Sequence, residues 1–526
     1  MLFGFALSGL QEFLYDLSPQ SPSLKERQVD GGRDRDAARR LRIRSLTLTL
    51  VPGLVAYELQ QRDPGSSIIY LGGGKLYMEA DAGAIDSLVR ERLPVLFQWL
   101  SSRSAGKLGA HWTRLDEAES RAALHTLIAN LAEQRWQAGR YGSQWHDLSS
   151  SICARTNEEG LGSREWESEN GNEFGGNSDW VGFEVGNGDW AVGDWRVGPV
   201  SEPDNVHIWL DRTKTDAPDR RKRPVVAIPT YTPKLTKDGD PGPGRHEDLR
   251  HGNIAPLFWL AQTDAADQPR EQGAPYLALL KMDGDGMGDL MRRALEKGLD
   301  EFTRTSEKLS NFFGRELTDM LMNQFGRIYL VYSGGDDLVL CGWYDDVARA
   351  AMSIRERYQR LQVGTVSAGI TFFTRQSPIL KAIEEADRAI EVAKGRHLPD
   401  HGDHVCVGGL RLSWDQFAKV IADADGLAKA VDDRALLRGE LQLIRQLGEP
   451  WLPSAPEAQR GLALRAIPLM HYFRSRRGNR DEGKWPSEVA ALFDSLKTST
   501  GDWPVATLVA MLAAWKTKVN GYQEEA

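Results

Sequence analysis

The stretch Ile328-Tyr329-Leu330-Val331-Tyr332-Ser333-Gly334-Gly335-Asp336-Asp337-Leu338-Val339-Leu340 decides the fold prediction. Two apolar runs with the length and the β-branched or aromatic content of buried strands flank residues 334–337. Gly334 and Gly335 permit a turn with positive φ and let a large polyanion approach the backbone. The sequence therefore predicts a β-hairpin whose tip presents Asp336 and Asp337. Adjacent carboxylates repel each other, and a hard cation such as Mg²⁺ or Mn²⁺ would offset that repulsion.

A second acidic cluster follows another predicted strand. The strand-like run 276–282 ends in Asp283-Gly284-Asp285-Gly286-Met287-Gly288-Asp289, and helical periodicity extends from about residue 289 to 299. A glycine-rich turn between a strand and a helix start directs backbone N–H groups toward phosphates. We therefore expect a triphosphate to be held by Gly284, Asp285, Gly286 and Gly288. If this strand lies beside the hairpin, Asp283 joins Asp336 and Asp337 in a site for two metal ions roughly 4 Å apart.

The acidic turn has other interpretations. The turn has aspartates at the first and third positions of an EF-hand loop and a glycine at the sixth. Met287 and Ala294, however, stand where that loop needs oxygen ligands. The glycine spacing does not match the dinucleotide-binding fingerprint. Two solvated acidic turns with no joint role remain an alternative.

The segment after the hairpin indicates the fold class. An amphipathic helix pattern covers 345–361, a strand 365–373 and a second helix 378–394. Strand, helix, strand, hairpin strand, helix, strand is the ferredoxin-like order of polymerase and cyclase palms. This region resembles GGDEF-type cyclases, and more closely the large polymerase/cyclase subunit of type III CRISPR effector complexes. That family has a Gly-Gly-Asp-Asp hairpin, a Ser-Ala-Gly-Ile strand (367–370) and an Ala-Lys helix end (393–394).

The resemblance implies roles for individual residues. Asp336 and Asp337 match the family's hairpin, Asp283 its metal-binding aspartate, and Lys394 a helical lysine that reaches nucleotide phosphates. Lys394 could equally cap the C-terminus of its helix.

The N-terminal region resembles the same family's first palm. Residues 3–14 match its opening strand and Gly-Ile-Gln-x-Phe-Ile segment, and residues 67–78 have the hairpin pattern with Gly72-Gly73-Gly74-Lys75 at the turn. Without carboxylates this turn cannot hold metals. The resemblance implies that the second palm binds the metals and that the first completes the nucleotide site across a pseudo-twofold interface.

Two features depart from the family pattern. We expect no helical histidine–aspartate nuclease domain, because the chain opens on the first palm strand and His146-Asp147 is a lone dipeptide in a Ser-rich segment. We also expect no zinc site, because the three cysteines, Cys153, Cys341 and Cys406, are far apart.

The predicted fold is α+β in four parts. A degenerate first palm spans 1–135, a Trp/Gly-rich segment and linker 136–254, the catalytic palm 255–412, and a C-terminal helical domain 413–526. The Trp/Gly-rich segment has short strand-like pieces whose tryptophans could form a small core, or a stacking surface for nucleic acid. A basic run at 220–223 could contact guide RNA or a neighbouring subunit, or be a solvated loop. The C-terminal helices are a plausible docking surface for small subunits.

Composition is consistent with this organisation. The chain has 526 residues and a net charge of −9, so any RNA contact must be local. No apolar run approaches the ~20 residues of a membrane span, so no membrane partner is expected, and unpaired cysteines suit a reducing cytoplasm.

The resemblance implies an ATP-using nucleotidyltransferase that makes cyclic oligoadenylate with two Mg²⁺ or Mn²⁺ ions. Its partners would be other type III effector subunits, guide RNA and target RNA. Two alternatives stay open: a catalytically idle scaffold of such a complex, and a stand-alone GGDEF-like cyclase that makes a dinucleotide.

Overall fold

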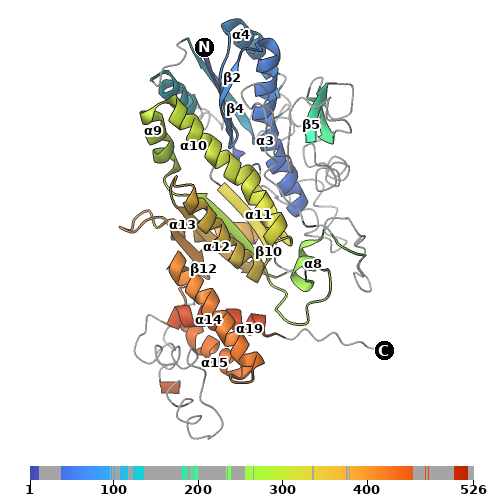
Figure 1. Cartoon of the computed structure of the whole chain (residues 1–526), viewed down its shortest axis with the longest axis vertical. Helices are drawn as coiled ribbons and strands as arrows, with labels where there is room; N and C mark the ends of the chain where they lie inside the picture. Colours follow the sequence, from blue (N-terminus) through green and yellow to red (C-terminus); the bar gives the residue numbers. More distant parts are fainter. Residues whose placement is uncertain are drawn as a thin grey trace.

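A computed structural model of the chain places the acidic hairpin in a six-stranded sheet (Figure 1). The whole sheet is described except the turn of the hairpin. The described residues are 1–10, 13, 37–94, 96–97, 100, 107–116, 122–134, 181–185, 191–192, 195–199, 233, 235–238, 255–264, 266–334, 337–374, 377, 379–453, 468–469, 472 and 503–518. Gly335 and Asp336 lie outside them.

The strand order of this sheet is β13-β12-β11-β8-β10-β9. Its members are β8 (Leu277–Gly284), β9 (Ile328–Gly334), β10 (Asp337–Trp343), β11 (Val366–Phe373), β12 (His404–Val407) and β13 (Leu410–Ser413). The four strands β11-β8-β10-β9 are antiparallel and in ferredoxin-like order, which confirms the predicted palm. The β12–β13 hairpin extends the palm beyond that prediction, because β12 pairs in parallel with β11.

Helices cover both faces of the sheet, because side chains along each strand alternate between two apolar cores. Leu280 of β8 and Leu340 of β10 join the core under α12 (Tyr344–Arg360). Leu279 of β8 and Val339 of β10 join the core under α13 (Ile379–Lys394). Helix α8 (Leu257–Gln262) contributes to the second core.

A second sheet at the N-terminus has the same topology. Its order is β2-β3-β1-β4, with β1 (Leu2–Ser8), β2 (Ser67–Gly72), β3 (Lys75–Glu79) and β4 (Gly109–Leu115). Helix α3 (Ala37–Arg62) connects β1 to β2, and α4 (Ala82–Glu91) follows β3. The chain is therefore α+β, and the repeated strand order supports the predicted pair of palms.

At the junction of the two sheets, one helix from each packs on the other sheet (Figure 1). Helix α3 from the first sheet packs on β9 of the second, and α10 (Leu299–Asn311) from the second packs on β2 of the first. Both helices lie on the connection from the first to the second strand of their own sheet. The contacts are thus reciprocal, as a pseudo-twofold axis requires.

The connection from β8 to β9 contains more helix than was predicted. Helix α9 (Met287–Lys297) begins two residues before the predicted start, and α10, the π-helix η4 (Phe312–Glu316) and α11 (Leu317–Gln324) follow it. Within the π-helix, the carbonyl of Phe313 accepts a hydrogen bond from Ser333 Oγ at 2.7 Å. This contact joins the helix directly to the strand that precedes the hairpin.

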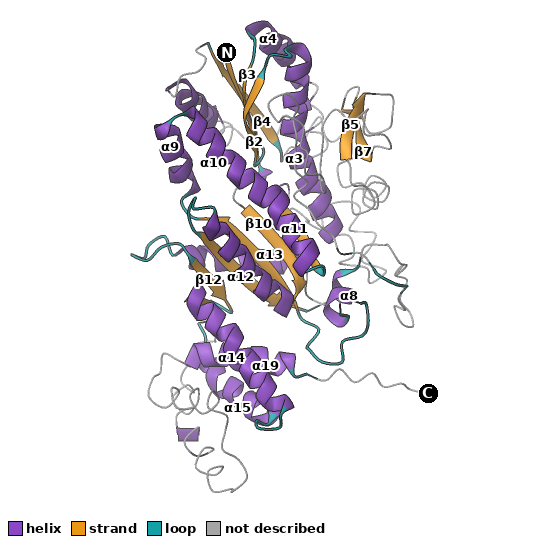
Figure 2. Cartoon of the chain, in the orientation of Figure 1, coloured by secondary structure: helices purple, strands orange, loops and turns teal. Residues whose placement is uncertain are grey.

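The C-terminal helices share a core with the second sheet (Figure 2). They are α14 (Trp414–Asp432), α15 (Arg438–Gly448), the short helix η5 (Glu449–Trp451) and α19 (Trp503–Lys516). Tyr276 stacks on Trp515 with ring centroids 4.3 Å apart. Lys516 pairs with Asp425 of α14 at 2.8 Å and also with Asp345 of α12. This helical region is therefore packed against the palm as one body.

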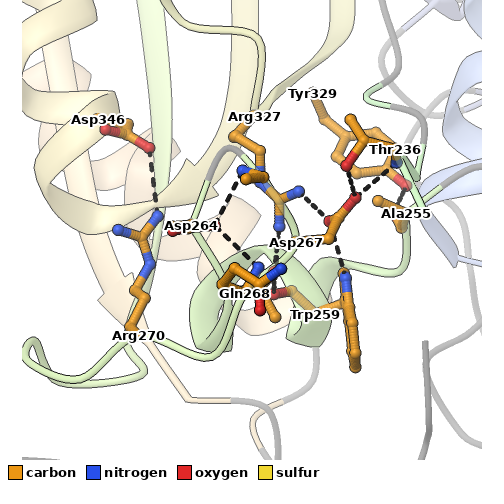
Figure 3. A network of polar contacts seen from close by, with 12 residues as sticks. Thr236, Ala255, Trp259, Asp264, Asp267, Gln268, Arg270, Arg327, Tyr329 and Asp346 are labelled. Carbon is orange, nitrogen blue, oxygen red and sulfur yellow. Dashed lines mark hydrogen bonds and ion pairs between the residues drawn. The ribbon is translucent and has the colours of Figure 1, made fainter. Parts of the chain in front are cut away.

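A buried polar network attaches the segment before β8 to the second sheet (Figure 3). Arg327, directly before β9, pairs with Asp267. The Asp267 carboxylate also accepts hydrogen bonds from Thr236 N at 2.6 Å and from Trp259 Nε1 at 2.9 Å. Burial alone would raise the pKa of Asp267, but the hydrogen bonds from Thr236 and Arg327 hold it below its ordinary value.

Parts of the Trp/Gly-rich segment form a three-stranded sheet of β5 (Val181–Val185), β7 (Trp195–Pro199) and β6 (Ala191–Val192). Trp166, Trp180 and Trp190 of the predicted tryptophan core, the basic run 220–223, His146, Asp147 and Cys153 lie outside the described residues. Cys341 and Cys406 are buried. None of the helices in the described ranges is long and apolar enough to cross a membrane.

Gly369 of β11 should be intolerant of a side chain. A Cβ there would lie 2.6 Å from Ala386 O and 2.6 Å from Ile390 N, both backbone atoms of α13. We expect Gly369→Ala to lower the free energy of unfolding by about 1–3 kcal/mol, measured by urea unfolding. Gly426→Ala is the matched control, because nothing lies within 4 Å of a Cβ at that α14 position. It should stabilise the chain by about 0.5–1 kcal/mol. Equal effects of the two substitutions would contradict the close approach of α13.

Candidate active site

Two of the three predicted metal-binding carboxylates face each other across neighbouring strands. Asp337 is the first residue of β10, and its register partner on β8 is Asp283. Directly opposed residues of an antiparallel pair have Cα atoms only about 4.5–5.5 Å apart. Asp336 precedes Asp337 in the chain but lies outside the described residues. The sheet thus brings Asp283 to the hairpin, as predicted from the sequence.

Like charges directly opposite each other on a sheet are destabilising. Here Lys394, in the last turn of α13, forms an ion pair with Asp283. The Lys394 and Asp283 side chains are 13% and 16% exposed, so solvent screens this pair only partly. The ammonium group therefore offsets part of the repulsion between Asp283 and Asp337.

The approach of α13 to β8 is what brings Lys394 to the acidic pair. Lys281, two residues before Asp283 on the same face of β8, pairs with Asp387 of α13. Asp387 and Lys394 are two helical turns apart, so both project toward the sheet. Gly369 beneath them lets the helix approach closely, because its missing Cβ would collide with the α13 backbone. Lys281 and Asp387 were not among the predicted site residues.

Burial lowers the pKa of Lys394 to about 8, and the neighbouring cations Arg396 and Lys281 act in the same direction. The contact with Asp283 favours the charged form. Lys394 thus sits where an anion from either source, a carboxylate or a phosphate, would stabilise its positive charge.

The glycine-rich turn after Asp283 has the open geometry expected of an anion cradle. Gly286 adopts a left-handed conformation (φ 62) and is the N-cap of α9, where no side chain caps the helix. A Cβ at Gly286 or Gly288 would meet nothing within 4 Å. The first backbone N–H groups of α9 are therefore accessible to a ligand, and the helix dipole favours a negative charge there.

Asp285 has a different environment from the glycines around it. Its Oδ2 accepts hydrogen bonds from Thr365 Oγ1 at 2.8 Å and from Asp403 N at 2.7 Å, and its Oδ1 accepts one from Ser367 Oγ at 2.7 Å. The carboxylate is thus held within the protein. Its predicted contact with a triphosphate has no geometric support, in contrast to the open backbone at Gly286 and Gly288.

The first sheet lacks carboxylates at the corresponding positions. Lys75 follows the glycine turn as Asp337 does, and its register partner on β1 is Ala6. The partner of Ala6 on β4 is His111, whose Nε2 lies 2.8 Å from Ser8 Oγ. Where the second sheet has two acids, the first has a lysine and an alanine, so the predicted loss of metal binding at this tip is consistent with its residues.

The donor set in the second sheet suits a hard divalent cation. Within the described residues no three His, Cys, Asp or Glu side chains gather as a metal site, and Asp336, the third predicted ligand, is not among them. Asp283 and Asp337 supply carboxylate oxygens, and the Lys394 ammonium already forms an ion pair with Asp283. Mg²⁺ and Mn²⁺ prefer such oxygen ligands.

Comparison with known protein families agrees with this geometry. Residues 276–401 match the family model described as Cas10/Cmr2, second palm domain. This region of the chain is therefore similar to the second palm domain of Cas10 proteins. Cas10 proteins are the large subunits that the sequence resemblance indicated, and the matched range contains both acidic clusters and Lys394.

Among its relatives is the Cas10/Csm1 protein of Enterococcus italicus, named as a CRISPR system single-strand-specific deoxyribonuclease of subtype III-A. It is 37% identical over 130 residues, 24% of this chain and 17% of the relative. The Mycobacterium tuberculosis protein of the same name is 30% identical over 189 residues, 31% of this chain and 23% of the relative. The alignments therefore span less than a quarter of either relative.

Solved structures extend the likeness in fold to nearly the whole chain. The Csm1–Csm4 cassette in complex with cA4 superposes with a TM-score of 0.62 at 16% identity, covering 98% of this chain and 69% of that one. The cassette in complex with one ATP gives a TM-score of 0.63 at 16% identity, again over 98% and 69%. At this identity the likeness shows a shared fold and no more.

Removing the Lys394 charge should expose the repulsion between the two carboxylates. We expect Lys394→Met to lower the free energy of unfolding by about 1–3 kcal/mol, because it leaves the mostly buried Asp283 without its cation. The measurement is urea unfolding in the presence of a chelator.

The control is the double variant Lys394→Met/Asp283→Asn, which removes both members of the pair. It should recover part of the lost stability, since no unpaired charge then remains beside Asp337. A double variant less stable than Lys394→Met alone would contradict the proposed charge balance.

Proposed function

We propose that this chain is a Cas10-type nucleotidyltransferase that joins ATP molecules into cyclic oligoadenylate. In this reaction the 3′-oxygen of one ATP forms a bond to the α-phosphorus of a second, and the bond to pyrophosphate breaks. The hydroxyl proton is lost to solvent. Repeated transfer followed by ring closure gives the cyclic product.

The observation that carries the proposal is the register pairing of Asp283 with Asp337, with Lys394 beside them. Opposed carboxylates destabilise a sheet, so their position at a strand end needs a compensating cation. In a nucleotide-binding palm, a divalent ion would compensate the two carboxylates and would link them to a triphosphate.

We propose that Asp283, Asp336 and Asp337 hold two Mg²⁺ or Mn²⁺ ions. When bound, such ions activate the attacking ribose hydroxyl and stabilise the charge on the leaving pyrophosphate. The residues of the chain orient the reactants. Gly334 and Gly335 leave room for the polyanion at the hairpin, and Lys394 would turn from Asp283 toward a phosphate.

The phosphates would be held at the start of α9. Its N-cap, Gly286, has no side-chain cap, and no neighbour would contact a Cβ at Gly286 or Gly288. Accessible backbone N–H groups at a helix start bind phosphate without a dedicated side chain. The first-palm hairpin at Gly73 and Gly74 would complete the site for the second nucleotide.

The choice of ATP is supported by the structures that share this fold. Those Csm1–Csm4 cassettes were crystallised with one ATP, AMPPNP, pppApA, cA3 and cA4. We infer that for this chain ATP is the substrate, a linear oligoadenylate the intermediate and a cyclic oligoadenylate the product.

The partners we propose are other subunits of a type III CRISPR effector complex, together with its guide and target RNA. One neighbour in fold is a Csm1–Csm4 subcomplex of the type III-A CRISPR–Csm interference complex. The net charge of −9 requires that any RNA contact in this chain be local. The four predicted domains, with boundaries at 135, 254 and 412, remain part of this proposal.

Asp336→Ala/Asp337→Ala should abolish product formation while leaving the fold intact. We expect the rate to fall by more than about 100-fold, because these carboxylates are proposed as direct metal ligands, and loss of outer-shell support alone costs 10–100-fold. The assay is pyrophosphate release and mass spectrometry of products made from ATP and Mn²⁺ by the assembled complex with target RNA.

Asp300→Asn/Glu301→Gln is the matched control, because it removes another adjacent pair of acids, in the first turn of α10. It should leave the rate unchanged. Full activity of the hairpin variant would refute the metal assignment. Wild-type complex that releases no pyrophosphate would favour the scaffold alternative, and dinucleotide made from GTP would favour the GGDEF-like one.

A further inference from the structure

Both oxygens of the Asp285 carboxylate accept hydrogen bonds from within the protein. Three donors from outside its own turn, Thr365 Oγ1, Ser367 Oγ and Asp403 N, lie 2.7–2.8 Å from its two oxygens. Its own backbone N–H donates to Thr365 O at 2.8 Å. Hydrogen bonds to an ionised acceptor are among the strongest in proteins, so this side chain is firmly fixed.

These contacts complete a closed ring of links that runs from Asp285 through Asp283 and Lys394 to the 402–403 loop and back to Asp285. Asp285 is two residues from Asp283, which pairs with Lys394. The Lys394 carbonyl accepts a hydrogen bond from Gly402 N at 2.9 Å, and the next residue, Asp403, donates its N–H to Asp285. The ring therefore fixes the acidic strand end relative to the end of α13.

The loop that completes this ring is shaped to reach Asp285. Gly402 has a left-handed backbone (φ 78), and a Cβ there would lie 2.9 Å from the Asp285 carboxyl carbon. Asp403 also has a positive φ of 51, which is uncommon outside glycine. Its side chain is held by Arg355 of α12, with Nη2 to Oδ2 at 3.0 Å. This backbone geometry is maintained by contacts on both sides.

We propose that Asp285 is a positioning residue that sets the distance between the Asp283 carboxylate and the Lys394 ammonium. The inference rests on the proposed function, because it concerns the metal and phosphate sites assigned there. It replaces the expectation that Asp285 itself contacts the triphosphate. A carboxylate near a triphosphate would repel it, whereas one anchored on β11 and the 402–403 loop holds the phosphate-binding turn in place.

The test is Mn²⁺ binding by the full chain without nucleotide, measured from the electron paramagnetic resonance signal of free Mn²⁺. Thermal unfolding first establishes that each variant is folded at the measuring temperature. We expect Asp285→Ala to weaken Mn²⁺ binding by about 10–100-fold, as is typical when an outer-shell partner of a metal ligand is lost. A role in stability alone would leave the affinity of the folded chain unchanged.

Asp285→Asn separates positioning from direct ligation. The amide oxygen still accepts from Asp403 N and Thr365, and the Ser367 hydroxyl can reverse to accept from the amide NH₂. Mn²⁺ affinity should therefore stay within about threefold of wild type. If Asp285 were itself a metal ligand, the asparagine and alanine variants would be similarly impaired. Asp300→Ala, at an exposed position in α10, is the control and should bind Mn²⁺ like wild type.

The outcomes are distinguishable. Wild-type Mn²⁺ binding with an unaffected Asp285→Ala would overturn the positioning role but leave the proposed function intact. Absence of Mn²⁺ binding by the wild type would overturn the metal site and the role of Asp285 with it. If Asp285→Ala does not fold, Thr365→Val and Ser367→Ala remove the donors separately. Each should weaken Mn²⁺ binding, and wild-type affinity in both would refute the proposal.

Discussion

The candidate active site depends on one constraint: two carboxylates lie opposite each other at the end of one strand pair. Asp283 and Asp337 are register partners, so the distance between them is set by the sheet, independently of any loop. The β8–β10 pairing continues without a shift from Asp337 to Trp343. A slip of one residue would turn Asp337 to the opposite face. Opposed carboxylates destabilise the sheet. Helix α13 packs closely enough over the pair for Lys394 to reach Asp283, and this contact offsets part of that cost.

The two sheets show how one topology can support an acidic site and a non-acidic counterpart. Both have the same strand order, and each packs a crossover helix on the outer hairpin strand of the other. They differ at the hairpin tip, where Ala6 and Lys75 occupy the register positions of Asp283 and Asp337. A metal site needs only a few side chains, so exchanging these removes it while the fold is kept. Opposed carboxylates therefore lie at only one of these two hairpin tips.

Local patterns predicted most of the second sheet because its strands are apolar and its turns are rich in glycine. Strand β11 and helices α12 and α13 lie within a residue or two of their predicted bounds. Helix α10 was not predicted, although its buried residues, Phe302, Thr305, Ser306 and Leu309, follow helical spacing; two of the four are hydroxylic and do not stand out as apolar. The anchoring of Asp285 could not be predicted either, since its partners come from distant segments. Only the folded chain brings Thr365 and Asp403 to it.

The most direct test of the account is the anomalous diffraction of Mn²⁺ in crystals of the chain soaked with a non-hydrolysable ATP analogue. The account predicts two peaks roughly 4 Å apart between Asp283 and the 336–337 pair. It also predicts that the Lys394 side chain has moved from Asp283 to a phosphate oxygen. An ordered nucleotide without Mn²⁺ at these carboxylates, or with Mn²⁺ bound elsewhere, would contradict it.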